Sequence, residues 1–165
     1  MGYEVQIIRG ELEALVDLQG APNSIRDWVG PGFPEFPDAP NTASTLNNLS
    51  LYWTAPERWL LRAPIALEDQ LIAITKPDSA PLEISVVLVS DTHQFFHIDG
   101  REAAQIIAIA CPLDTHPLAF PANGSGYTDI FGIKGLLLRS GDGFEIAVES
   151  SYADMIEDYL DRACA

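Results

Sequence analysis

The sequence predicts an α+β fold in which pairs of strands are followed by helices. Three observations support this prediction. Short stretches alternate apolar and polar residues or form β-branched runs, which is typical of strands. Turn-forming residues separate these stretches into pairs, and a stretch with apolar residues at helical spacing follows each pair. We therefore expect antiparallel or mixed sheets that carry helices on one face.

Three such strand–strand–helix units follow one another from residue 46 onward. Their ranges are 49–53, 59–62 and 66–75 in the first unit, 82–89, 93–98 and 101–110 in the second, and 135–139, 144–148 and a helix from 151 in the third. Leu67, Leu71, Ile72 and Ile74 give the first helix a rough apolar stripe. The third pair of strands is joined by Ser-Gly-Asp-Gly at 140–143, a sequence that favours a hairpin turn.

The segment before residue 46 differs from the rest, so we expect an N-terminal arm over 1–45 and an α+β domain over 46–165. Pro31, Pro34, Pro37 and Pro40 recur every third residue, the period of polyproline II. One interpretation is a surface loop or linker. The other is an arm that lies across a partner protein and seats Phe33 and Phe36 in that partner's pockets, because a preordered segment loses little entropy on docking.

The charge balance excludes two classes of partner. The chain has 9 Lys and Arg against 24 Asp and Glu, a formal net charge of -15. Nucleic-acid affinity depends on Lys and Arg displacing counterions, and anionic lipid also attracts basic surfaces. We therefore expect neither a nucleic-acid partner nor a membrane partner. No signal peptide and no apolar run of membrane-spanning length is visible, so we expect a cytoplasmic protein.

No catalytic or metal-binding constellation stands out. Cys111, Asp114 and His116 include the residue types of a nucleophilic site, but they crowd into one short segment. We expect Cys111 to be a buried structural residue and Asp114 to make a local turn. His93 and His97 fall in an expected strand, where their side chains would be roughly 13 Å apart, too far for one metal ion.

One segment carries a family resemblance. Residues 110–121, Ala-Cys-Pro-Leu-Asp-Thr-His-Pro-Leu-Ala-Phe-Pro, closely resemble a segment of the sarcosine oxidase gamma subunit family. Four further stretches resemble family segments in the same order, at 56–61, 90–94, 99–103 and 151–154. The residues that carry the main motif are Cys111, Pro112, Leu113, Asp114, His116, Pro117, Phe120 and Pro121. A loop stiffened by three prolines suits internal bracing or an interface, and the residues leave both open.

The resemblance implies a non-catalytic, accessory subunit of a heterotetrameric sarcosine-oxidase-like complex that oxidatively demethylates sarcosine or a related N-methyl amine. Its partners would be larger alpha, beta and delta subunits. It also implies a fold similar to the folate-binding aminomethyltransferase domain. The complex uses FAD, FMN, NAD and tetrahydrofolate, and the resemblance implies that none of these cofactors is held by this chain.

Two other functions stay open. The first is a stand-alone protein of the aminomethyltransferase-like fold that binds folate or another small ligand. The acidic composition, with Lys76 and Lys134 as the two lysines, offers little attraction to the glutamate tail of folate. The second, weaker alternative is an enzyme that uses Cys111 as its nucleophile.

Overall fold

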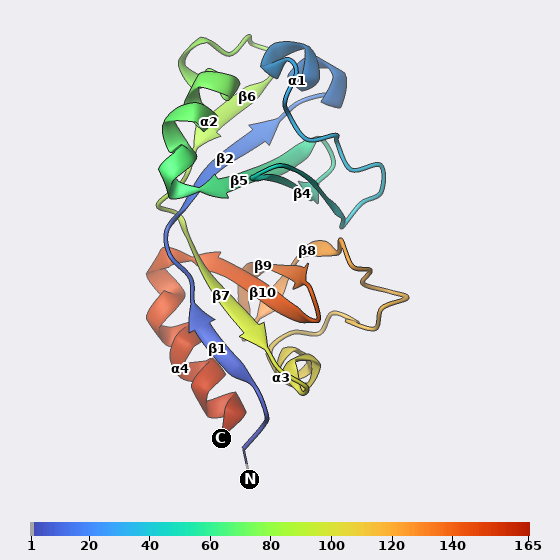
Figure 1. The fold of residues 1–165 in the computed structure, drawn as a ribbon, viewed down its shortest axis with the longest axis vertical. Helices are drawn as coiled ribbons and strands as arrows, with labels where there is room; N and C mark the ends of the chain where they lie inside the picture. Colours follow the sequence, from blue (N-terminus) through green and yellow to red (C-terminus); the bar gives the residue numbers. More distant parts are fainter. Residues whose placement is uncertain (1) are drawn as a thin grey trace. The chain divides into compact units, whose positions relative to one another are not determined.

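The computed structural model describes residues 2–165, which form two compact units. Unit 1 contains residues 2–11 and 92–165, and unit 2 contains residues 12–91. Each unit has one five-stranded antiparallel sheet with helices packed on one face (Figure 1). The predicted α+β class is therefore confirmed.

Unit 2 has the strand order β3-β4-β5-β2-β6. In chain order its elements are β2 Glu13–Gln19, α1 Pro22–Val29, β3 Ala43–Leu46, β4 Leu49–Ala55, β5 Arg58–Pro64, η1 Ile65–Leu67, α2 Glu68–Thr75, η2 Pro77–Ser79 and β6 Ser85–Leu88. Apolar residues at every second position of the strands face α1 and α2, as the pleat requires. Val16, Leu18 and Leu61 of the strands form this core together with Ile25 of α1 and Leu71 of α2.

Unit 1 has the strand order β1-β7-β10-β9-β8. In chain order its elements are β1 Gln6–Arg9, β7 His93–Asp99, α3 Ala103–Ala110, β8 Ser125–Ile130, β9 Ile133–Ser140, β10 Gly143–Glu149, η3 Ser150–Tyr152 and α4 Ala153–Cys164. Phe96, Ile98, Phe144, Ile146 and Val148 share one face of the sheet and form a core with residues of α3 and α4.

The two units have the same topology. In both, a strand is followed by a helix, a loop, three consecutive strands, a short 3₁₀ turn and a second helix. The registers also agree, because Leu18 is paired with Trp59 in unit 2 as Ile98 is paired with Phe144 in unit 1. The chain is thus a structural duplication in which β2 corresponds to β7, β5 to β10, and the loop 30–42 to the loop 111–124.

Each sheet has one edge strand that lies outside the repeated topology, β1 in unit 1 and β6 in unit 2. β1 directly precedes β2 in sequence, yet it is paired with β7 in unit 1. β6 precedes β7, yet it is paired with β2 in unit 2. Each unit therefore takes an edge strand from the segment that leads into the other unit's repeat.

The structure corrects two expectations. The expected second strand–strand–helix unit does not exist, because β6 and β7 belong to different sheets and do not form a hairpin. The expected arm over 1–45 is also wrong, because this segment supplies β1, β2, α1 and β3. The expected boundary at residue 46 falls at the end of β3, within unit 2. The first and third expected units are confirmed as β4-β5-α2 and β9-β10-α4.

Candidate interaction site

The motif segment forms the loop 111–124, which joins α3 to β8 in unit 1 (Figure 1). α3 ends at Ala110, where Pro112 disfavours a helical conformation at the preceding residue. Cys111 is accordingly extended, with φ -145° and ψ 149°, while its N–H still bonds the Ile107 carbonyl at 2.8 Å. The sequence prediction that the helix ends before this proline is confirmed.

Cys111 is buried and free, with 5% of its surface exposed. Burial raises the pKa of its thiol, and hydrogen bonds with the Leu113 backbone and the Thr128 side chain oppose that shift. A raised pKa keeps the sulfur protonated, the form that is a poor nucleophile. The burial expected for Cys111 is confirmed.

Asp114 and His116 organise the backbone of the loop. Asp114 Oδ1 accepts a hydrogen bond from the His116 N–H at 2.9 Å, which is the local turn that the sequence predicts. His116 Nδ1 accepts one from the Leu118 N–H at 3.3 Å. The His116 carbonyl accepts two more, from Ala119 and Phe120, both at 2.8 Å. Both side chains therefore bond the loop itself, and neither bonds the thiol of Cys111.

Arg139 of β9 clamps the far side of the loop. Its Nη2 donates to the carbonyl oxygens of Thr115 at 2.6 Å and Phe120 at 3.0 Å. Its guanidinium also lies 4.4 Å from the ring centroid of Phe144, a cation–π contact. Phe120 is 2% exposed and belongs to the core of unit 1. Sequence reasoning missed Arg139, because nothing near it in the chain pointed to the loop.

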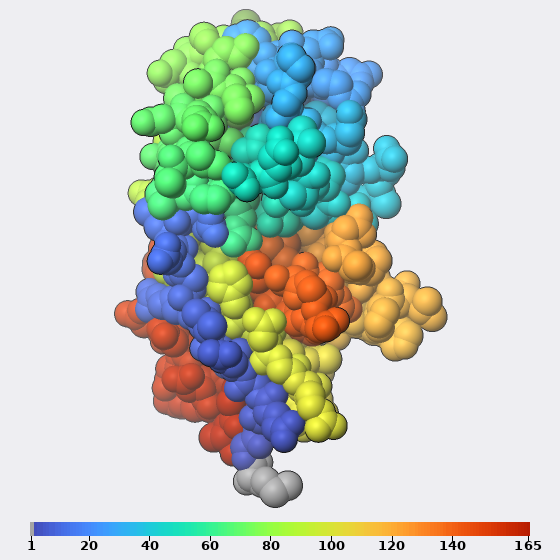
Figure 2. Space-filling model, in the orientation of Figure 1, coloured from blue at the N-terminus to red at the C-terminus, as the bar shows by residue number. Residues whose placement is uncertain are grey.

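The loop exposes a large aliphatic side chain. Leu118 is 92% exposed, between the exposed residues Pro117 and Ala119. Pro112 and Pro121 are exposed as well, whereas Leu113 is partly buried against the core. Figure 2 shows this segment, in gold and orange, standing out from the surface of unit 1.

Phe33 and Phe36 do not reach outward. Each is 8% exposed and lies in the core of unit 2. Their rings stack with centroids 5.6 Å apart, and Phe36 meets Trp59 edge-on at 4.8 Å. The interpretation in which both rings enter a partner's pockets is therefore corrected. The Pro-rich segment is a loop whose two rings cover the core beside β5.

The two histidines of β7 lie apart from this loop in sequence, and each has its own contacts. His93 Nδ1 is 2.7 Å from the Thr92 hydroxyl, and its Nε2 is 3.1 Å from the Tyr127 hydroxyl. His97 Nδ1 is 3.4 Å from Glu145 Oε1. The predicted strand is confirmed here. Among residues 2–165, no group of three or more His, Cys, Asp or Glu side chains could hold a metal ion.

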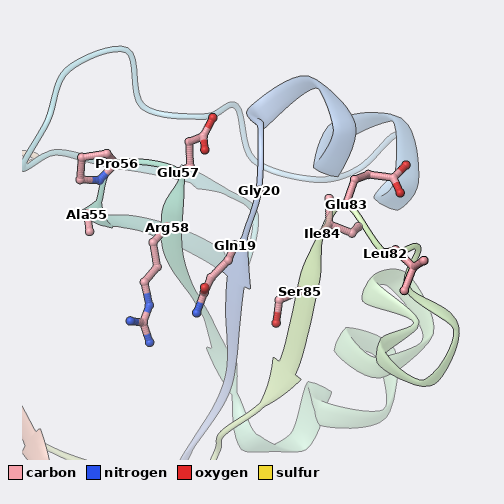
Figure 3. Close-up of a pocket in the computed structure, with 10 residues that line it drawn as sticks. All are labelled: Gln19, Gly20, Ala55, Pro56, Glu57, Arg58, Leu82, Glu83, Ile84 and Ser85. Atoms are coloured by element: carbon pink, nitrogen blue, oxygen red, sulfur yellow. The ribbon is translucent and has the colours of Figure 1, made fainter.

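Unit 2 has a shallow cavity of about 430 Å³. Figure 3 shows its lining from three segments: the end of β2, the turn between β4 and β5, and the approach to β6. Its single arginine, Arg58, donates to both oxygens of Asp17, and the carboxylates of Glu57 and Glu83 also line the space. Charge-assisted hydrogen bonds from Arg or Lys are the strong contacts to phosphates and carboxylates, and this lining offers no unpaired cation for them.

The chain matches a known family. The model of the sarcosine oxidase, gamma subunit family matches residues 35–165. The chain belongs to this family. The resemblance found in the motif at 110–121 is thereby confirmed.

Curated members of the sarcosine oxidase gamma subunit family are distant in sequence. The sarcosine oxidase subunit gamma of Corynebacterium sp. (strain P-1) is 25% identical over 119 residues, covering 72% of this chain and 57% of the relative. That of Arthrobacter sp. is 26% identical over 116 residues, covering 69% and 54%. The chain thus spans little more than half the length of the curated relatives it matches.

Two solved structures share the fold of this family member. A chain of the heterotetrameric sarcosine oxidase from Corynebacterium sp. U-96, in complex with pyrrole 2-carboxylate, has a TM-score of 0.81 at 22% identity, covering 97% of this chain and 83% of that chain. The glycine cleavage system aminomethyltransferase T from Bartonella henselae has a TM-score of 0.68 at 19% identity, covering 95% and 45%. The predicted aminomethyltransferase-like fold is confirmed. Among residues 2–165, no helix is both long and apolar enough to cross a bilayer.

Proposed function

We propose that this chain is an accessory, non-catalytic subunit of a heterotetrameric oxidase complex that demethylates sarcosine or a related N-methyl amine. The observation that carries the proposal is the family match over residues 35–165. The fold shared with a chain of heterotetrameric sarcosine oxidase supports it. The proposed partners are the larger alpha, beta and delta subunits, and the proposed location is the cytoplasm.

The chemistry of the described residues supports an accessory role. The thiol of Cys111 is buried with a raised pKa, and Asp114 and His116 bond the backbone of their own loop. The cavity of unit 2 offers no unpaired cation to the phosphates or carboxylates of flavin, nicotinamide or folate cofactors, because its arginine is paired with Asp17. We therefore assign the FAD, FMN, NAD and tetrahydrofolate of such a complex to the other subunits.

Co-expression with the larger subunits from the same genome tests the proposal. We expect this chain to co-purify with them in a fixed ratio, and we expect its omission to lower the yield or the oxidase activity of the complex. Failure to co-purify, together with unchanged oxidase activity when the chain is omitted, would overturn the proposal.

Calorimetric titration of the isolated chain with tetrahydrofolate tests the stand-alone alternative. We expect no saturable heat, because folate carries an anionic tail and the cavity of unit 2 offers it no unpaired cation. Saturable binding would favour a ligand-binding protein of the aminomethyltransferase-like fold over an accessory subunit.

A further inference from the structure

We propose that Leu118, with Pro117 and Ala119 beside it, is the contact through which this chain docks on a larger subunit of the complex. The side chain of Leu118 would enter an uncharged, apolar pocket on that subunit. This inference rests on the proposed function and deepens it by naming the docking surface. It starts from one observation, which is that a rigid loop holds a leucine 92% exposed to water.

The first argument is the rigidity of the loop. The His116 carbonyl, the Asp114 carboxylate and the Arg139 guanidinium together make five hydrogen bonds to loop backbone within 3.0 Å. The ring of Phe120 lies in the core of unit 1 and packs directly against Gly124. A Cβ at position 124 would lie only 2.9 Å from that ring. A backbone that is already ordered loses little conformational entropy when its exposed side chain is buried by a partner.

The second argument is the charge of the loop. The chain carries a net charge of -15, yet residues 115–128 contain no Asp, Glu, Lys or Arg. Covering this segment with a partner therefore buries no Asp, Glu, Lys or Arg side chain of the segment. An acidic surface would resist burial because each carboxylate needs a compensating partner. Residues 115–128 are thus a part of the chain that an apolar pocket can cover at low desolvation cost.

The third argument is the corresponding loop of unit 2. The loop 30–42 occupies the same position in the duplicated topology and is also rich in proline. It places both phenylalanines, Phe33 and Phe36, in its own core and exposes the acidic residues Glu35 and Asp38. One topology thus carries two different loops. The loop of unit 1 keeps Phe120 inside and turns Leu118 outward.

A matched pair of substitutions in the full complex tests the inference. Leu118→Asp places a charge where the apolar pocket would close, and Leu82→Asp makes the same change at a leucine of unit 2 that is 106% exposed. Both variants should unfold at the wild-type temperature, because neither side chain is buried. We expect Leu118→Asp to weaken association with the larger subunits by at least about a hundredfold and Leu82→Asp to leave it unchanged.

Two further variants measure how much the leucine side chain itself contributes to association. Leu118→Ala should weaken association about tenfold to a hundredfold, the effect of losing one buried leucine side chain. Leu118→Met should associate within a few-fold of wild type, because methionine has a similar volume and adapts to an existing pocket. Equal loss with alanine and methionine would contradict a pocket shaped for this side chain.

The outcomes separate this inference from the proposed function. If the wild-type chain does not associate with the larger subunits, both fall. If the wild type and Leu118→Asp associate equally, or if Leu82→Asp fails equally, the docking surface is overturned and the proposed function stands. Light scattering on the chain alone gives one more check. A wild-type dimer that Leu118→Asp dissociates would mean that a second copy covers Leu118, which also overturns the inference.

Discussion

Arg139 donates a hydrogen bond of 3.0 Å to the carbonyl oxygen of Phe120 while its guanidinium lies 5.7 Å from the centroid of the same ring. This pair ties the motif loop to β9. The charged group is therefore held between the backbone of the loop and the core of unit 1. The motif residues Asp114 and His116 form hydrogen bonds within the loop. Arg139, which lies outside the motif, adds hydrogen bonds from β9.

Replacing Arg139 with methionine should loosen the loop. The substitution keeps apolar volume but removes two hydrogen bonds donated by a charged group, so we expect a loss of about 2–4 kcal/mol of stability. Hydrogen exchange should accelerate at the amides of Ala119 and Phe120. Arg101→Met is the matched control, because the Arg101 side chain is 86% exposed and it makes one long ion pair of 3.6 Å. Unchanged exchange in Arg139→Met would contradict the clamp.

Removing the Phe36 ring should destabilise unit 2. The ring lies in the core against Trp59, so Phe36→Ala should cost about 3–5 kcal/mol of unfolding free energy. Tryptophan fluorescence during denaturant unfolding measures this, since Trp28, Trp53 and Trp59 all belong to unit 2. Pro40→Ala, at an exposed position of the same loop, should change little. A stable Phe36→Ala variant that had lost only partner binding would restore the arm interpretation.

A close approach of two backbones depends on Gly100. Its φ is +129°, and a Cβ at this position would clash with the carbonyl oxygen of Glu4. We expect Gly100→Ala to cost at least about 3 kcal/mol, through both the disfavoured φ and a contact with backbone that cannot move aside. Gly32→Ala is the control, with φ +89° and open space around the Cβ. It should cost about 1–2 kcal/mol. If thermal unfolding showed the same loss of stability in Gly100→Ala and Gly32→Ala, the close approach of residues 4 and 100 would be contradicted.

The thiol of Cys111 makes stability depend on alkaline pH. Burial raises its pKa in the folded state above that of the unfolded chain. A group of this kind contributes fully below its unfolded pKa, and the contribution is lost as pH rises toward the folded value. The unfolding free energy of the wild type should therefore fall more steeply than that of Cys111→Ala as the pH rises above about 8.5, the ordinary pKa of a cysteine thiol. Burial raises the pKa of Cys164 as well, and that effect is common to both proteins. Parallel curves would contradict a buried thiol.

Local patterns predicted the two hairpins but not how distant strands pair. The β4-β5 and β9-β10 hairpins with their helices follow from alternation, turn residues and helical stripes close together in the chain. The partner of β6 is β2, far away in sequence, and no nearby residue indicates that pairing. The same limit hid β1, whose partner β7 lies beyond the whole of unit 2.

In the motif loop, too, some features could be predicted from nearby residues and others could not. Pro112 predicted the helix end at Ala110, the turn preference of aspartate predicted the turn at Asp114, and the usual burial of free cysteines predicted the burial of Cys111. The clamp by Arg139 could not be predicted, because it depends on the β8-β9 register, which sets Ser125 opposite Leu138 and so brings Arg139 beside the end of the loop. The Phe33 and Phe36 interpretation failed because period-three spacing describes the backbone and does not say whether a ring faces a partner or its own core.

The mass of the intact complex tests the central claim most directly. Native mass spectrometry of the oxidase purified through a tag on its largest subunit should show a species that contains this 18.0 kDa chain, and the chain should leave the complex in the Leu118→Asp variant. A complete and active oxidase whose mass leaves no room for this chain would contradict its assignment as an accessory subunit.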